Sequence, residues 1–187
     1  MRMFTTQVLG KTGGEVLATA ELLAIAAAAE GRPAAFMSTT SPDAALCMID
    51  GWTGAPQGLP PMTDALIVQD PDEARRADAI GGLSPDAYVL VNATCGFGDL
   101  GLAEQVGRLC RDRTLILPVT RLARDSSDEV IRSSVIGGFA ALCPVVSLDS
   151  VASAIEDREP GDLALACVDA AAAAYEFVRA EKEALAA

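Results

Sequence analysis

Apolar positions along the chain fall into two alternating patterns. Short β-prone apolar runs, typical of buried strands, occupy residues 3–9, 32–39, 44–50, 65–69, 87–91 and 114–117. Longer runs typical of helices occupy residues 15–30, 101–111, 128–142, 147–157 and 161–182, and a polar helix is predicted for residues 72–79. Because strands alternate with helices, we predict an α/β fold: a three-layer sandwich with a largely parallel, Rossmann-like sheet and a helical C-terminal third.

A glycine-rich turn joins the first predicted strand to the first predicted helix. It consists of Gly10, Lys11, Thr12, Gly13 and Gly14. A strand that turns into a helix in this way presents backbone N–H groups and the positive end of the helix dipole, which suit a phosphate. The P-loop pattern fails because Thr5 stands where a glycine is needed, and the dinucleotide pattern fails at Thr12 and Glu15. A tight connection without a ligand explains the turn equally well.

Further candidate binding residues follow the other predicted strands, since ligands of parallel α/β sheets bind at the carboxyl ends of strands. Besides the glycine turn, these positions are residues 38–41, Asp70, Asn92 and residues 118–121. The candidate binding residues among them are Ser38, Thr39, Thr40, Asp70 and Asn92. A carboxylate at the end of a buried strand is placed to meet a ligand. Capping of the helix after Pro71 is an equally good explanation for Asp70.

Three local features predict contacts rather than chemistry. The Gly- and Pro-rich residues 52–62 form a predicted loop that could contact a partner. Gly137 and Gly138 lie inside a predicted helix, where glycine is destabilising, so a close helix–sheet or subunit contact is expected there. Ser147 is predicted to cap the helix that follows it.

Composition and charge restrict the possible functions. The 187 residues fit a single domain, 1–187, and 51% of them are hydrophobic. With 14 basic and 26 acidic residues the net charge is −12, which argues against nucleic acid and anionic membranes as partners. The chain has no histidine, the commonest general base and metal ligand. We therefore expect no catalytic or metal-binding residues, and a binding or subunit role.

The cysteines indicate a reducing compartment. Five cysteines are scattered without a C-x-x-C pair, which disfavours a disulfide scaffold or an iron–sulfur site. No signal peptide is visible at the N-terminus, and the apolar runs are too short to span a membrane. The expected location is the cytoplasm.

Several blocks together resemble the gamma subunit, or gamma-type domain, of 2-oxoacid:ferredoxin oxidoreductases of the pyruvate and 2-ketoisovalerate type. Members of that family open with G-x-G-G-x-G and a V-V-T-A-A-E-I-L-like helix, which residues 10–23 match in part. The resemblance continues, in the same order and spacing, through residues 65–71, 82–86, 89–92, 135–140, 146–148 and 154–156.

The resemblance implies an accessory subunit of a hetero-oligomeric complex that oxidatively decarboxylates a 2-oxo acid such as pyruvate. Thiamine diphosphate would lie on alpha and beta subunits, and iron–sulfur clusters on another subunit that passes electrons to ferredoxin. The gamma unit would pack on these subunits and help to seat coenzyme A. The candidate coenzyme residues are then the glycine turn, the strand-end residues named above, and Arg132 with Ser133.

The chain departs from the family pattern in ways that weaken a polyanion site. Thr12 and Glu15 replace two glycines of the opening motif, and a carboxylate at a helix start disfavours phosphate. Residues 41–44 and Met48 stand where arginines are common, and Arg132 replaces a usual asparagine. The alternative reading is therefore a stand-alone ligand-binding or scaffold protein that kept the fold and lost the coenzyme site.

Overall fold

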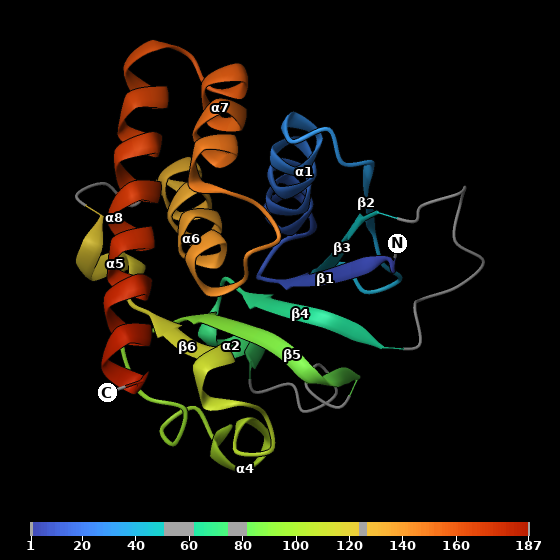
Figure 1. The fold of residues 1–187 in the computed structure, drawn as a ribbon, viewed down its shortest axis with the longest axis vertical. Helices are drawn as coiled ribbons and strands as arrows, with labels where there is room; N and C mark the ends of the chain where they lie inside the picture. The colour runs from blue at the N-terminus through green and yellow to red at the C-terminus, as the bar shows by residue number, and fades with distance from the viewer. Residues whose placement is uncertain (1, 51–61, 75–81, 124–126, 187) are drawn as a thin grey trace.

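The computed structural model describes residues 2–50, 62–74, 82–123 and 127–186. Its six strands form one sheet in the order β2-β3-β1-β4-β5-β6 (Figure 1). The strands are β1 Phe4–Leu9, β2 Ala34–Ser38, β3 Ala44–Ile49, β4 Thr63–Val68, β5 Leu83–Asn92 and β6 Thr114–Leu117. The carboxyl ends of β1, β4, β5 and β6 meet along one edge, because these strands pair in parallel.

The sheet is largely parallel, as predicted, but β3 runs against both of its neighbours. Only residues 39–43 connect β2 to β3, which is too short for the crossover that parallel strands require. β3 therefore forms a hairpin with β2 and inserts between β2 and β1. This insertion places β2 at the edge of the sheet, one strand away from the glycine turn.

Helices cover both faces of the sheet, which confirms the α/β sandwich. The long helices α1 Gly13–Ala29, α6 Asp128–Leu142, α7 Leu148–Arg158 and α8 Gly161–Ala186 lie on one face (Figure 1). Short helices lie elsewhere around the sheet: α2 Pro71–Ala74, α4 Ala103–Val106, the 3-10 turn Arg111–Arg113 and α5 Val119–Leu122. Together α6, α7 and α8 form the predicted helical C-terminal third.

One predicted helix is wrong. Residues 101–111 contain only the four-residue helix α4, followed by a turn. Gly101 takes a positive φ of 74° before this helix, and Gly107 caps its end. Two glycines that close off both ends outweigh the helical spacing of the apolar residues between them. Most of the predicted loop 52–62 and of the predicted helix after Ala74 falls outside the described residues.

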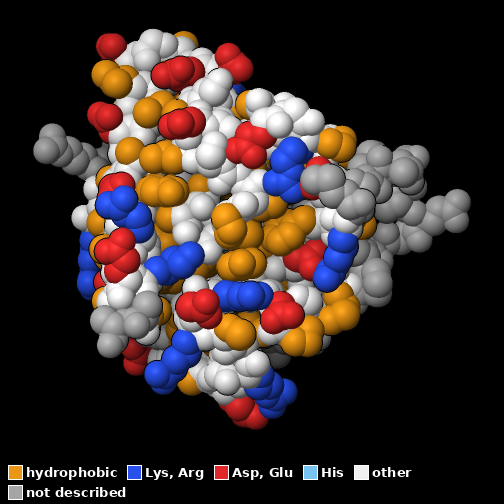
Figure 2. Space-filling model, viewed as in Figure 1, with side chains coloured by type: hydrophobic (Ala, Val, Ile, Leu, Met, Phe, Trp, Pro, Cys, Tyr) orange, Lys and Arg blue, Asp and Glu red, His pale blue; other side chains and the backbone are white. Residues whose placement is uncertain are grey.

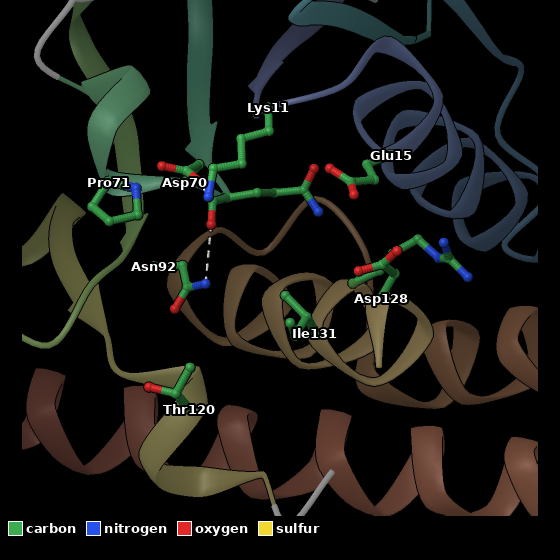
Figure 3. Close-up of a pocket in the computed structure, with 10 residues that line it drawn as sticks. Lys11, Glu15, Asp70, Pro71, Asn92, Thr120, Asp128 and Ile131 are labelled. Carbon is green, nitrogen blue, oxygen red and sulfur yellow. Dashed lines mark hydrogen bonds and ion pairs between the residues drawn. The ribbon is translucent and has the colours of Figure 1, made fainter. Parts of the chain in front are cut away.

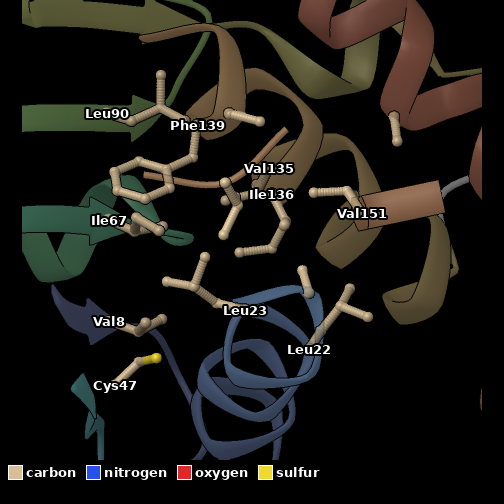
Figure 4. Packing of buried hydrophobic residues seen from close by; sticks show 14 of the residues in the cluster. Val8, Leu22, Leu23, Cys47, Ile67, Leu90, Val135, Ile136, Phe139 and Val151 are labelled. Carbon is tan, nitrogen blue, oxygen red and sulfur yellow. The ribbon is translucent and has the colours of Figure 1, made fainter. Parts of the chain in front are cut away.

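The larger core lies between the sheet and the long helices. Val8, Ile67 and Leu90 project from adjacent parallel strands toward Phe139 of α6, and Leu23 of α1 closes the same cluster (Figure 4). All five are at most 1% exposed. Burial of each side chain contributes about 1.5–3 kcal/mol, so this cluster fixes α1 and α6 against the sheet.

The glycine pair of α6 allows two close contacts. A Cβ on Gly138 would lie 2.8 Å from Leu117 Cδ2 of β6, which confirms the predicted helix–sheet contact. A Cβ on Gly137 would lie 2.2 Å from the backbone oxygen of Ala171 in α8. Helices α6 and α8 therefore meet backbone to backbone at this position.

Glu30, at the end of α1, holds the start of α7. Its carboxylate accepts hydrogen bonds from Ser147 N (2.7 Å) and Ser150 Oγ (2.8 Å). Ser147 Oγ accepts from Ser150 N (3.2 Å), so the predicted cap is confirmed. Burial acts to raise the pKa of Glu30, but the serine hydrogen bonds outweigh it and lower the pKa below its ordinary value of 4.5.

A lowered carboxyl pKa predicts a defined pH dependence. Glu30 contributes stability in full above about pH 4.5 and loses it as the pH falls through the lower folded-state value. Glu30→Gln removes this titration, so we expect a shallower loss of stability on acidification than in the wild type. Urea midpoints between about pH 6 and pH 3 would measure it, with exposed Glu104→Gln as the control. If the urea midpoints of wild type and Glu30→Gln fall equally as the pH is lowered, the expectation is wrong.

Candidate functional site

A cavity of about 310 Å³ opens where the parallel strands end and α1 and α6 begin (Figure 3). It is lined by Lys11, Glu15, Gln69, Asp70, Pro71, Asn92, Thr120, Asp128, Ile131 and Arg132. Of the candidate residues predicted from sequence, four line it: Lys11, Asp70, Asn92 and Arg132. We call it the strand-end cavity.

The glycine turn is held mainly by the chain itself. Thr12 caps α1, with its hydroxyl accepting from Glu15 N at 3.3 Å. Gly10 N donates to Asp43 O at 3.0 Å. A Cβ on Gly13 would lie 2.5 Å from Pro42 O, so glycine is required there by the β2–β3 turn. Gly14 has open space around it and is exposed.

Lys11 and Asp70 form an ion pair across the mouth of the strand-end cavity. Lys11 Nζ lies 2.9 Å from Asp70 Oδ2, and this hydrogen bond and the carboxylate charge raise the pKa of Lys11. The other oxygen of Asp70 accepts from Asp72 N at 2.9 Å. Asp70 therefore both caps the start of α2 and neutralises the lysine of the turn.

Asn92 ties three strand ends together. Its side chain donates to Gln69 O at 3.0 Å, just past β4, and accepts from Val119 N at 3.3 Å, just past β6. Both ends of the amide are used in this way, so its role in the structure is to fix the floor of the cavity.

Arg132 is buried beneath the cavity and paired with another helix. Its side chain is 9% exposed, and Nη2 lies 2.9 Å from Glu159 Oε1 at the end of α7. Its Nε has no hydrogen-bond partner among the described residues. The neighbouring Ser133 is buried and does not line the cavity. Burial raises the pKa of the Cys167 thiol in α8, and Ser133 acts to lower it.

Ser38, Thr39 and Thr40 lie in the β2–β3 hairpin and do not line the cavity. Thr39 stabilises the hairpin turn, with its hydroxyl 3.1 Å from both the backbone N and O of Ser41. Thr120, which belongs to the predicted strand end 118–121, does line the cavity. Gln69, Asp128 and Ile131 also line it, although sequence reasoning did not select them. Gln69, which precedes Asp70 directly, could have been found from the strand-end rule.

Carboxylates outnumber cations among the side chains that line the strand-end cavity. Lys11 and Arg132 are the cations among the lining residues, and both are paired with carboxylates. Glu15, Asp70 and Asp128 line the same space. Such surroundings disfavour a phosphate by Coulomb repulsion. Basic side chains on the face shown in Figure 2 are also scattered among acidic ones.

Two absences apply to the described part of the chain. No cluster of three or more cysteine, aspartate or glutamate side chains there could hold a metal ion. None of the helices in residues 2–50, 62–74, 82–123 and 127–186 is long and apolar enough to cross a membrane.

The fold is that of a Rossmann-like α/β domain with a cavity at its strand ends. Among curated proteins, the pyruvate synthase subunit PorC of Methanocaldococcus jannaschii is 29% identical over 113 residues. That match covers 60% of this chain and 58% of the relative, so it spans less than two thirds of either protein. No family model matches the chain.

Solved structures match over nearly the whole chain. The pyruvate oxidoreductase subunit PORC of Thermotoga maritima superimposes with a TM-score of 0.73 at 19% identity, over 94% of this chain and 97% of that one. The gamma subunit of a keto/oxoacid ferredoxin oxidoreductase from Geobacter sulfurreducens gives 0.71 at 17%, over 96% and 98%. The TM-scores show that the fold is shared, and at identities this low they show the fold alone.

A third structure is a 2-oxoglutarate:ferredoxin oxidoreductase from Magnetococcus marinus with 2-oxoglutarate, coenzyme A and succinyl-CoA bound. It gives a TM-score of 0.71 at 14% identity, over 98% of this chain and 32% of that one. Together with the curated relative, these matches confirm the resemblance carried by the sequence: the chain is similar to gamma subunits of 2-oxoacid:ferredoxin oxidoreductases.

Proposed function

We propose that this chain is an accessory, gamma-type subunit of a complex that oxidatively decarboxylates a 2-oxo acid and reduces ferredoxin. The observation that carries the proposal is the agreement between the curated PorC relative and two solved subunits of this kind, which match end to end. The single domain 1–187 would pack on thiamine diphosphate subunits, alpha and beta, beside an iron–sulfur subunit in the cytoplasm. The reaction itself would take place on those partners.

The site geometry supports an accessory role. The chain has no histidine, and the lysine and arginine that line the strand-end cavity are already paired with Asp70 and Glu159. The cofactors of the reaction are therefore expected on other subunits.

Contact with coenzyme A would fall on the exposed glycine turn, which borders the strand-end cavity at Lys11. Lys11 is 69% exposed, and Gly13 and Gly14 begin α1, where backbone N–H groups lie outside the helical hydrogen-bond ladder. Glu15 and the Lys11–Asp70 pair weaken this site for phosphate. We propose that coenzyme A is met there only jointly with a partner subunit.

Reconstitution of the complex tests the proposed subunit role. Co-expression with thiamine diphosphate and iron–sulfur subunits of the same source should give one hetero-oligomer that reduces a viologen dye with a 2-oxo acid. Omission of this chain should abolish assembly or activity. Subunits that assemble and turn over fully without it would refute the accessory role and favour the stand-alone reading.

A separate measurement tests the proposal that this chain binds coenzyme A only weakly. Calorimetric titration of the reconstituted complex with coenzyme A should give binding weaker than micromolar, that is, less favourable than about −8 kcal/mol. Saturable micromolar binding that is lost on Lys11→Ala would contradict the weakened site while leaving the subunit role intact.

A further inference from the structure

Unpaired groups from three elements converge on the strand-end cavity. Glu15 reaches it from the start of α1 and Asp128 from the start of α6 (Figure 3). Neither carboxylate makes a hydrogen bond or ion pair within the described residues, and the charge of Glu15 adds to the rise in the pKa of Lys11. Gln69, at the end of β4, contributes a buried side-chain oxygen that also has no partner there. Two carboxylates, half-buried Glu15 and exposed Asp128, and one buried amide oxygen of Gln69 therefore line the cavity as hydrogen-bond acceptors.

A buried donor without an acceptor lines the same cavity. Arg132 is 7% exposed, and its Nη2 is used by Glu159 while its Nε is left without a partner among the described residues. A buried N–H group without an acceptor is costly, so an acceptor atom on a ligand would be favoured there. The cavity can therefore receive both a hydrogen-bond donor and a hydrogen-bond acceptor of a ligand.

We propose that the strand-end cavity binds a small α-amino acid or α-amino amide. The ammonium group has three N–H donors, which match the three acceptors Glu15, Asp128 and Gln69. The carboxylate or carbonyl oxygen next to the ammonium supplies the acceptor for Arg132 Nε. A phosphate would satisfy Arg132 but would meet two uncompensated carboxylates.

The size and walls of the cavity fit a ligand of this class. Its volume of about 310 Å³ lies at the lower end of small-molecule sites. Ile131 gives one wall an apolar surface, and Asn92 and Thr120 add polar atoms. The inference concerns this cavity alone and does not depend on assembly into a complex.

The test uses the full chain and ligand-observed NMR with a panel of free amino acids, their amides and their N-acetyl derivatives. At least one free amino acid should bind, and its N-acetyl counterpart, which lacks the cation, should bind at least about tenfold more weakly. Glu15→Gln with Asp128→Asn should weaken binding by about tenfold or more, whereas exposed Glu183→Gln should not. Inorganic phosphate should not compete.

The proposal is overturned if no free amino acid or amide binds the wild type up to about 10 mM. Equal binding of the N-acetyl derivative, or displacement by phosphate, would overturn it too. The N-acetyl comparison is made on the wild type, so it decides the question even where the double variant fails to fold. Full binding by a folded double variant would also contradict the proposed ammonium contacts.

Discussion

Gly137→Ala should destabilise the protein by about 3 kcal/mol, because the added methyl group would enter the backbone of α8. The new Cβ would lie 2.2 Å from Ala171 O and 2.6 Å from Ala171 Cα. Backbone atoms cannot rotate away as a flexible side chain can, so α6 and α8 must separate. Urea unfolding followed by circular dichroism would measure the change in free energy.

A matched control is available in α1. Gly14 also lies in a helix at a negative φ, but a Cβ there would meet nothing within 4 Å. Gly14→Ala should be neutral or stabilise by up to about 1 kcal/mol. Equal losses for the two variants would show that the effect at Gly137 comes from helix propensity and not from the close contact.

Arg132→Met should cost about 3–5 kcal/mol, the range for breaking a buried ion pair. The substitution leaves Glu159, whose side chain is 12% exposed, without its main partner, since Arg158 Nε is 3.7 Å away. The exposed pair Arg108–Glu104 offers the comparison, and Arg108→Met should cost no more than about 1 kcal/mol.

The double variant Arg132→Met with Glu159→Gln separates the contribution of the ion pair to stability from the contribution of side-chain packing. With both charges removed, the desolvation cost also disappears, so the double variant should be more stable than Arg132→Met alone. If the loss in the double variant equals the sum of the losses of Arg132→Met and Glu159→Gln measured alone, the two side chains are not coupled and the interpretation of the pair is wrong.

The fold could be predicted well from sequence where apolar spacing and local capping agree. Helix 128–142 and strand 114–117 have the predicted limits, and Ser147 caps α7 as expected. The predicted helix 101–111 failed because Gly101 and Gly107 restrict it to one turn. The spacing of apolar residues does not by itself show where such glycines will end a helix.

The site could be predicted only in part. Lys11, Asp70 and Asn92 come together because the carboxyl ends of parallel strands share an edge. Ser38 does not join them, because β3 separates β2 from β1, and strand order is not written in local sequence. The Arg132–Glu159 pair was not found either, since it depends on how α6 and α7 pack.

The glycine turn is required by the fold itself, whether or not it binds a ligand. The hairpin turn at Pro42 requires Gly13, and the core packs α1 against β1, so the turn remains necessary for the fold. Its ligand chemistry can change without loss of the structure.

Isolation of the native protein from its source, by an affinity tag on this chain, tests the proposed role most directly. We expect a hetero-oligomer with the visible absorbance of iron–sulfur clusters, from which denaturation releases thiamine diphosphate. Native mass spectrometry should then give the mass of a complex that contains this chain and its partner subunits. A protein that runs alone and colourless under the same conditions would contradict the proposal.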